Sequence, residues 1–395
     1  MKILIIVLLS VSITLASCDK IFPEEAEISD VLEGPISDLS ETEKNQFLQG
    51  DKAFGEIYTS ETGLGPIYVE NSCVSCHVGG GKSHLNSIVT RFGQFDETGN
   101  HFLEFGGPQL QNKSLTGYQP EKIPTGVSIT KLIAPIVVGL GYLDFVTDAD
   151  IIAMSDPDDI DGDGVSGVPN WNAIPVFVDK RQNSIEKNGK FICRFGKKAS
   201  VYDIKQQIVQ ALNEDLGINS IYDTKDLHTQ KEIDPEISSI NINAMNFYLR
   251  TLKAPSRRNQ TDPEVIKGNE IFNNIQCSSC HRPTLKTGYS PINSLSYKEF
   301  HPFTDLLLHD MGPKLDDGYT EGSAKTAEWR TPPLWGLGLA KASQGGNYFL
   351  LHDGRARSIE EAILMHGGEA LSKKVSYLNL NETDKKALIK FLESL

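Results

Sequence analysis

The chain has 395 residues, of which 39% are hydrophobic, and a formal net charge of −14 at pH 7. Because nucleic acids are bound through a basic protein surface, this acidic balance argues against a nucleic-acid partner. The length is sufficient for two domains of ordinary size. Beyond the N-terminal residues, no stretch is long and apolar enough to predict a membrane-spanning helix.

The N-terminal segment has the pattern of a secretion signal. Lys2 precedes the apolar run Ile3–Leu9, which is too short for a permanent membrane anchor. The sequence Leu-Ala-Ser-Cys18 that follows resembles a bacterial lipobox; an ordinary signal peptide with an incidental cysteine is the alternative. We therefore expect a signal peptide over residues 1–17, lipidation of Cys18 and a flexible tether over residues 18–42. Such a protein is held in the cell envelope, facing the periplasm or on the outer membrane, and touches the membrane through its lipid alone.

One pentapeptide pattern, Cys-x-x-Cys-His, occurs twice. It comprises Cys73, Cys76 and His77 in the first copy and Cys277, Cys280 and His281 in the second. In this pattern the two thiols bond to the vinyl groups of a haem, and the histidine is placed to give a nitrogen to the iron. A zinc site needs four ligands, and a thioredoxin-type dithiol needs a βαβ context, so both alternatives fit less well. The sequence therefore predicts two covalently bound haem c groups and redox chemistry.

The helices expected around each pentapeptide are repeated as well. An apolar stripe that contains Gly50 precedes the first copy, and a similar stripe with Gly268 at the equivalent position precedes the second. An amphipathic helix closes each unit, over residues 237–252 and 383–395. This is the plan of a cytochrome c domain, in which the terminal helices cross beside the haem.

The repeated plan predicts a mainly α fold. We expect two tandem cytochrome c-like haem domains with long loop-rich insertions, over residues 43–255 and 256–395. The first domain is much the longer, because a stretch rich in glycine and proline separates His77 from its closing helix. Insertions of this length usually carry function, so we expect this one to build a pocket over the first haem.

Alternating acidic residues mark one further segment. Asp159, Asp161 and Asp163 are followed by Gly164, in the spacing of the first half of a calcium-binding loop. The glutamate that such a loop carries at its twelfth position is absent, and Asn170 stands there. The sequence leaves two interpretations open, a calcium site and an acidic surface turn.

Three short motifs in the C-terminal part carry a family resemblance. They are Thr331-Pro-Pro-Leu334, His352-Asp-Gly354 and Ile359-Glu-Glu361. Together with the two pentapeptides, they resemble the bacterial di-haem cytochrome c peroxidase superfamily and, within it, the di-haem oxidoreductase branch. The resemblance implies that the distal ligand of the second haem falls on His366, with Met365 and His352 as alternatives. Neighbours on a helix point about 100° apart, so only one of His366 and Met365 can face the iron.

The resemblance also implies roles around the first haem. Its iron is expected to be the reaction site, with His84, His101 or no side chain as the sixth ligand. Gln109 and Glu121 are the candidates for moving a proton between the oxygens of a bound peroxide. Arg355 is a candidate partner for a haem propionate, and a solvated surface charge is its alternative role.

The predicted function is that of an envelope-anchored, peroxidase-like di-haem oxidoreductase. The C-terminal haem takes electrons from a redox partner, a small cytochrome or another electron carrier, and passes them to the N-terminal haem. Peroxide or an organic small molecule reacts there. Two alternatives stay open: a haem-dependent oxygenase or modification enzyme that acts on an organic substrate, and a plain electron-transfer cytochrome with two haems.

Overall fold

The computed structural model describes residues 31–93, 95–96, 99–100 and 107–395. The expected signal peptide, the lipidation site Cys18 and the candidate ligand His101 lie outside these residues, so their roles remain predictions. Within the described part of the chain, no helix is long and apolar enough to cross a membrane.

The fold is a mixture of helices and small sheets, so the prediction of a mainly α protein is wrong. The structure is 32% helical with 14% strand. Most strands have only two to four residues and pair with partners distant in the sequence, as β2 (Val89–Phe92) does with β6 (Ile129–Leu132). Because strands this short do not establish an alternating pattern, the insertion reads as loop in the sequence.

The sheets are all antiparallel and small. The only one with three strands in the described part has the order β7 (Asn170–Asn172), β9 (Lys190–Cys193), β8 (Glu186–Lys187). The other pairs are β1 (Ile67–Tyr68) with β5 (Lys113–Ser114), β3 (Phe95–Asp96) with β4 (Gly99–Asn100), β10 (Leu285–Lys286) with β11 (Glu299–Phe300), and β12 (Leu308–Asp310) with β13 (Glu328–Arg330).

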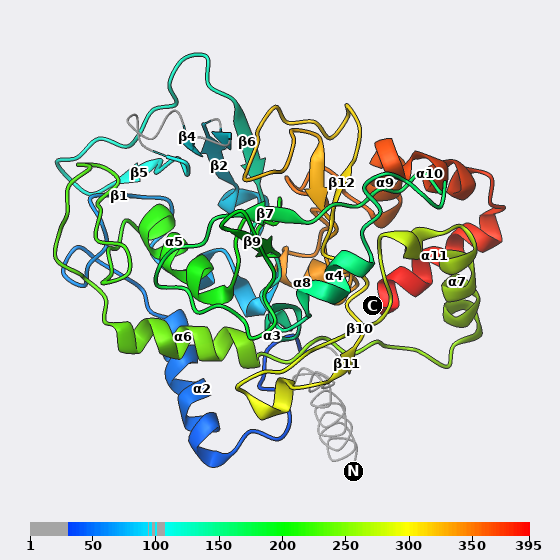
Figure 1. Ribbon diagram of the computed structural model, residues 1–395, viewed down its shortest axis with the longest axis horizontal. Helices are drawn as coiled ribbons and strands as arrows, with labels where there is room; N and C mark the ends of the chain where they lie inside the picture. The colour runs from blue at the N-terminus through cyan, green and yellow to red at the C-terminus, as the bar shows by residue number, and fades with distance from the viewer. Residues whose placement is uncertain (1–30, 94, 97–98, 101–106) are drawn as a thin grey trace, which may run out of the picture. The chain divides into compact units, whose positions relative to one another are not determined.

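Two pairs of crossing helices frame the fold (Figure 1). The first pair is α2 (Glu41–Phe54) with α6 (Ser239–Thr251), and the second is α7 (Pro263–Asn274) with α11 (Glu382–Ser394). The remaining helices are α3 (Leu140–Asp144), α4 (Asp148–Ala153), α5 (Ile204–Leu216), α8 (Ala340–Ser343), α9 (Ile359–Met365) and α10 (Leu371–Leu378).

A glycine allows the close approach in each crossing. A Cβ atom added to Gly50 would lie 2.1 Å from the carbonyl oxygen of Ala244, and one added to Gly268 would lie 2.1 Å from that of Ala387. The next contacts are also equivalent, with the Cβ atoms of Tyr248 at 2.5 Å and Phe391 at 2.6 Å. The two crossings are therefore the same structural unit, used once before each pentapeptide.

Two hydrophobic clusters form most of the core. The larger surrounds α2, α5 and α6 and takes residues from both predicted domains, including Phe54 and Tyr248 from the first and Leu295 and Trp335 from the second. The smaller surrounds α7 and α11. The larger cluster also includes residues from the end of the predicted tether. These are Leu32, Ile36 and Leu39, which are buried there.

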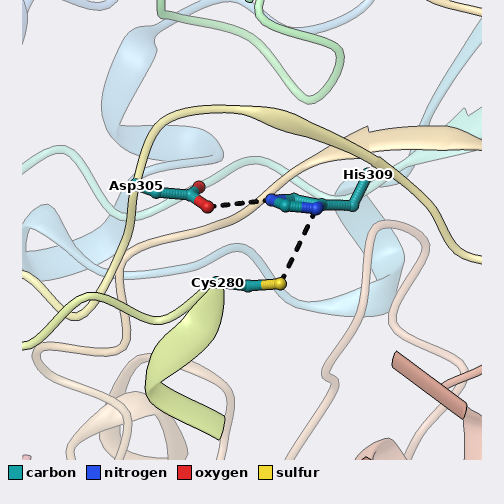
Figure 2. A group of neighbouring side chains, drawn as sticks. All are labelled: Cys280, Asp305 and His309. Carbon is teal, nitrogen blue, oxygen red and sulfur yellow. Dashed lines mark hydrogen bonds and ion pairs between the residues drawn. The ribbon is translucent and has the colours of Figure 1, made fainter. Parts of the chain in front are cut away.

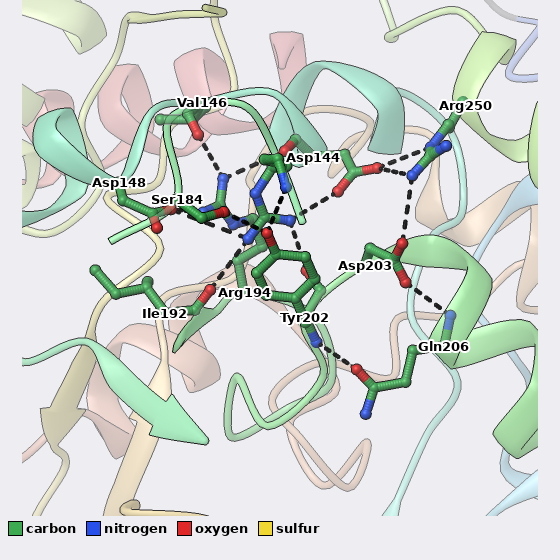
Figure 3. Close-up of polar contacts among 11 residues, drawn as sticks. Asp144, Val146, Asp148, Ser184, Ile192, Arg194, Tyr202, Asp203, Gln206 and Arg250 are labelled. Atoms are coloured by element: carbon green, nitrogen blue, oxygen red, sulfur yellow. Dashed lines mark hydrogen bonds and ion pairs between the residues drawn. The ribbon is translucent and has the colours of Figure 1, made fainter. Parts of the chain in front are cut away.

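A buried ion network ties the insertion to α6 (Figure 3). Arg194 is fully buried and pairs with Asp148 at the start of α4. Asp144, at the end of α3, pairs with Arg181 at 3.2 Å and with Arg250 of α6 at 2.8 Å. Charges buried this deeply are tolerated only when they are paired, so the network fixes how α3, α4 and α6 meet.

Candidate functional site

The two pentapeptides adopt the same local structure. Each starts with a 3₁₀ turn, η2 (Cys73–Ser75) in the first and η6 (Cys277–Ser279) in the second. The backbone amides of His77 and His281 donate to the carbonyls of Cys73 and Cys277, each at 3.0 Å. The four cysteines of the two segments are free thiols. Each segment therefore presents two thiols and an imidazole within a single turn of the chain.

The histidine of each segment is held as a neutral ligand. Nδ1 of His77 lies 3.0 Å from the carbonyl oxygen of Pro135, and Nδ1 of His281 lies 3.0 Å from that of Phe303. A carbonyl only accepts, so Nδ1 carries the proton and Nε2 keeps its lone pair. Burial lowers the pKa of both imidazoles to about 4, which keeps them neutral at physiological pH. Neutral imidazole is the form that binds a metal.

A second imidazole lies beside the second segment. Repulsion from His366 contributes to the low pKa of His281, so the two rings are neighbours. Nδ1 of His366 lies 2.7 Å from the carbonyl oxygen of Ala362, which leaves its Nε2 free as well. Met365 packs against the smaller hydrophobic cluster, and His352 stacks on Trp329 with ring centroids 3.7 Å apart. Of the three predicted ligands, His366 is the one that acts on His281, and its Nε2 is available.

The first segment has a carboxylate near its two thiols. Asp215, at the end of α5, raises the pKa of both Cys73 and Cys76, which places its carboxylate near the two thiols. The side-chain amide of Gln109 donates to this carboxylate. Burial, helped by repulsion from Glu214, raises the pKa of Asp215 to about 7. A carboxyl group with this pKa can both accept and release a proton near neutral pH.

Arg91 forms ion pairs next to Asp215 and Gln109. Its guanidinium pairs with Glu214 at 3.4 Å and with Glu321 at 3.3 Å. Strand β2 carries Arg91 opposite Gln109, through an isolated antiparallel bridge. The β2 strand and the end of α5 thus bring Arg91, Gln109, Glu214 and Asp215 together beside the first pentapeptide.

His84 is not arranged like His366. Its Nδ1 accepts a hydrogen bond from the amide of Asn86 at 3.2 Å, and its ring contacts Phe349 edge to face. The charged group that acts on His77 is instead the ammonium of Lys197, which lowers the pKa of that histidine further. The two sites are thus alike in their thiols and proximal histidines and different in what surrounds them.

Comparison with known proteins identifies the family of the chain. A sequence model of the family described as "Di-haem oxidoreductase, putative peroxidase" matches residues 121–395, more than half of the chain. The chain belongs to this family. No curated protein matches the chain. Among solved structures, hydrazine synthase from Kuenenia stuttgartiensis is similar over 92% of this chain and 94% of its own, with 13% sequence identity and a TM-score of 0.36.

Membership in the di-haem oxidoreductase family identifies haem as the cofactor and oxidation–reduction as the class of reaction. The residues of both pentapeptides fit this cofactor, because each offers free thiols and a neutral imidazole with its Nε2 available. The matched range includes the second pentapeptide, Asp215 and His366, and begins after the first pentapeptide.

Around the second haem segment, His309 is a structural cation. Figure 2 shows it between Asp305 and Cys280, a grouping of possible metal ligands. Its Nε2 lies 2.8 Å from Asp305, and its Nδ1 lies 2.7 Å from Glu369 and 3.6 Å from the sulfur of Cys280. Despite burial, the two carboxylates hold the pKa of His309 well above its ordinary value. The two ring nitrogens of His309 thus link Asp305 to Glu369 beside the second segment.

Glu121 accepts hydrogen bonds from the backbone on either side of Gln109. One carboxylate oxygen accepts from the amide of Gly107 at 3.3 Å, and the other accepts from the amide of Gln111 at 2.7 Å. Burial raises the pKa of Glu121, and the hydrogen bonds from the amides of Gln111 and Gly107 offset part of that shift. Both of its oxygens therefore bind backbone, whereas Gln109 reaches the carboxylate beside the thiols.

The structure also shows the surroundings of Arg355 and of the acidic loop. Arg355 is 42% exposed, and its Nε donates to Asp353 at 2.6 Å. In the loop, carboxylate oxygens of Asp156, Asp159 and Asp161 lie within 4.8 Å of one another. Asp163, expected in this group, instead accepts from the amide of Val165 at 2.8 Å and from the hydroxyl of Ser279 at 3.3 Å. Calcium binding by this loop remains a prediction.

The sequence interpretation missed Asp215. Its signal was the adjacent pair Glu214 and Asp215 at the C-terminal end of an amphipathic helix. Carbonyl groups make this end of a helix electronegative, so two carboxylates there are unfavourable unless another role retains them. Arg91 had no comparable signal, since a single arginine in a four-residue strand is ordinary.

Proposed function

We propose that this protein is an envelope-anchored di-haem c-type oxidoreductase of the peroxidase kind, in which the C-terminal haem relays electrons to a reactive N-terminal haem. One observation carries the proposal, the difference between the two attachment segments. His281 has the imidazole of His366 beside it, whereas the first segment has the carboxylate of Asp215. An iron with two imidazole ligands suits electron transfer, and an iron with one protein ligand is open to a substrate.

The proposed reaction is the reduction of hydrogen peroxide. Two electrons from the donor and two protons convert one peroxide molecule into two molecules of water. Haem at the first segment supplies the electron transfer when it is bound. The carboxylate of Asp215 takes a proton from one peroxide oxygen and returns it to the other, a role for which a pKa of about 7 is suited. Gln109 orients that carboxylate by donating to it.

The haems are proposed to be attached through thioethers to Cys73 and Cys76 and to Cys277 and Cys280. The free thiols and the repeated 3₁₀ turns support this attachment. Calcium in the acidic loop is a separate proposal from the sequence pattern, and calorimetric titration of the metal-free protein tests it.

The partner and the location follow from the charge and the N-terminal pattern. A net charge of −14 favours a basic electron donor such as a small cytochrome, through attraction between opposite surfaces. Lipidation of Cys18 would hold the protein in the cell envelope, and labelling with a radioactive or clickable fatty acid tests it.

The decisive experiment measures peroxide-dependent oxidation of a reduced small cytochrome by the wild type and by Asp215→Asn. If Asp215 must be deprotonated to accept a proton, the wild-type rate rises with pH around pH 7. Asp215→Asn should lower the rate at least 10²-fold, the usual contribution of a general base, and remove this rise. Glu121→Gln is the matched control and should keep the pH midpoint.

Three outcomes would contradict the proposal. A pH midpoint that persists in Asp215→Asn excludes this residue as the proton carrier. Six-coordinate spectra of both haems that do not change with peroxide indicate a plain electron-transfer cytochrome. Consumption of oxygen with an organic substrate, in place of peroxide, indicates an oxygenase.

A further inference from the structure

Three positively charged side chains gather near the first histidine. Lys197 lies directly after Gly196, and the backbone amide of Arg330 donates to the carbonyl of Lys197 at 3.0 Å. Nε of Arg330 donates to the carbonyl of Gly196, also at 3.0 Å. Lys82 and Arg330 both repel the ammonium of Lys197, and Lys197 in turn acts on His77. The first haem segment therefore faces a cluster of cations, which we call the basic cluster: Lys82, Lys197 and Arg330.

The backbone on either side of the basic cluster is fixed. Ser83, next to Lys82, is buried; its hydroxyl accepts from the amide of Ala134 at 2.9 Å, and its carbonyl accepts from the side chain of Gln344 at 3.1 Å. At the other lysine, the two hydrogen bonds from Arg330 hold the turn. The cations are therefore placed by the fold.

The two lysines of the basic cluster have no partner for their charge. Neither ammonium makes a hydrogen bond or an ion pair with any residue in the described part of the chain. Burial lowers the pKa of Lys82 to about 8 and that of Lys197 to about 7, yet both side chains keep accessible surface. The ammonium groups of both lysines are therefore largely buried without a compensating partner.

The next lysine along the chain shows the contrast. The ammonium of Lys198 donates to the carbonyls of Lys325, Thr326 and Glu328 at 3.0–3.1 Å and pairs with Asp317 at 3.5 Å. A buried ammonium without such partners is unfavourable, because it loses its hydration and gains nothing in return. An anion bound next to Lys82 and Lys197 would supply the charge partner that these two ammonium groups lack.

We propose that Lys82, Lys197 and Arg330 form a carboxylate-binding site that receives the propionates of the haem held at Cys73 and Cys76. This inference rests on the proposed attachment of haem there. The acidic group attracting Lys197 from within the protein is Asp353, which is already paired with Arg355.

The orientation of the segment agrees with this assignment. In a haem, the propionates lie at the edge opposite the vinyl groups that bond to the cysteines. The negative group Asp215 acts on Cys73 and Cys76, whereas the positive group Lys197 acts on His77. Lys197 therefore acts on the histidine and not on the thiols, as expected if the basic cluster lies near the propionate edge of the ring.

The test uses the haem-loaded protein and the variants Lys82→Gln and Lys197→Gln. We expect both variants to shift the propionate deformation band of the first haem in resonance Raman spectra, because they remove its charged hydrogen-bond donors. We also expect both to lower the midpoint potential of that haem, since loss of a nearby positive charge favours the oxidised iron. Lys113→Gln is the matched control: it removes the same charge beside Cys76, at the vinyl edge, and should leave the propionate band unchanged.

Further measurements separate the possible failures. Mass spectrometry of the peptide with Cys73 and Cys76 reports whether haem is attached; its absence would overturn both this inference and the proposed function. Attached haem with an unchanged propionate band in both lysine variants overturns this inference alone. Benzoate titration of the holoprotein tests whether the site instead binds a carboxylate ligand from solution. Binding that depends on Lys197, with an unchanged band, would assign the site to an external carboxylate and overturn the propionate assignment.

Discussion

The close crossing of α7 and α11 makes a strong prediction for Gly268→Ala. The added Cβ would lie 2.1 Å from the carbonyl oxygen of Ala387 and 2.6 Å from the Cβ of Phe391. Ordinary contacts begin at 3.4 Å, so the helices must separate by more than an ångström. Overpacking of this kind costs about 3 kcal/mol, at the upper end of the usual range, because Phe391 is fully buried. The better helix propensity of alanine returns about 1 kcal/mol, which leaves a net loss of about 2 kcal/mol.

The assay is thermal unfolding of the haem-loaded protein, followed by far-ultraviolet circular dichroism and by the absorbance of the haems. A net loss of about 2 kcal/mol lowers Tm by roughly 4–8 °C in a domain of 150–250 residues. Gly55→Ala is the matched control, since its Cβ would meet the nearest atom, the carbonyl oxygen of Asp51, at an ordinary 3.4 Å. That variant should be unchanged or slightly more stable. If Gly268→Ala unfolds at the same temperature as Gly55→Ala, the close crossing is refuted.

Three further predictions follow from the site and the buried charges. His366→Ala should convert the second haem from a low-spin to a high-spin electron paramagnetic resonance signal, whereas Met365→Ala should leave that signal unchanged; the reverse result would assign the ligand to Met365. Arg194→Met should lower the free energy of unfolding by about 3–5 kcal/mol in denaturant titration, because it leaves the buried carboxylate of Asp148 with a weaker partner. Burial and repulsion raise the pKa of Asp203 from 3.8 to about 6, so the folded state binds more protons than the unfolded state between these values. Stability should therefore fall as pH rises from about 4 to about 6, and Asp203→Asn, which preserves the helix cap, should flatten that dependence; an unchanged slope would contradict the assignment.

The parts of the fold that the sequence predicts are those with local patterns. The pentapeptides, the glycines at equivalent helix positions and the closing amphipathic helices all appear within short windows, and the structure contains each of them. The prediction of a mainly α protein was wrong because the small sheets depend on pairing between distant segments. β2, for example, ends at Phe92, and its partner β6 begins only at Ile129, far along the chain. Nothing in either four-residue strand identifies its partner.

The same distinction holds for the candidate site. His366 could be located from the sequence because it follows recognisable motifs on the helix that ends at Met365. Around the first segment, Gln109 was a candidate from the sequence, whereas Asp215 and Lys197 were not, because they come from distant parts of the chain and approach the segment only through the fold. Lys197 and Lys198 show the same limit of sequence reasoning. The ammonium of Lys198 has hydrogen-bond partners and that of Lys197 has none in the described part of the chain, a difference that only the tertiary structure reveals.

The duplicated crossing also determines the order in which the chain can complete its two haem segments. The α2–α6 crossing is available once residue 251 has emerged, whereas the α7–α11 crossing requires the residues of α11, up to Ser394. A chain delivered from its N-terminus therefore assembles the helical frame around Cys73 and Cys76 while the frame around Cys277 and Cys280 is still incomplete. If haem is attached during export, as proposed, the helical frame of the first segment would be available before that of the second.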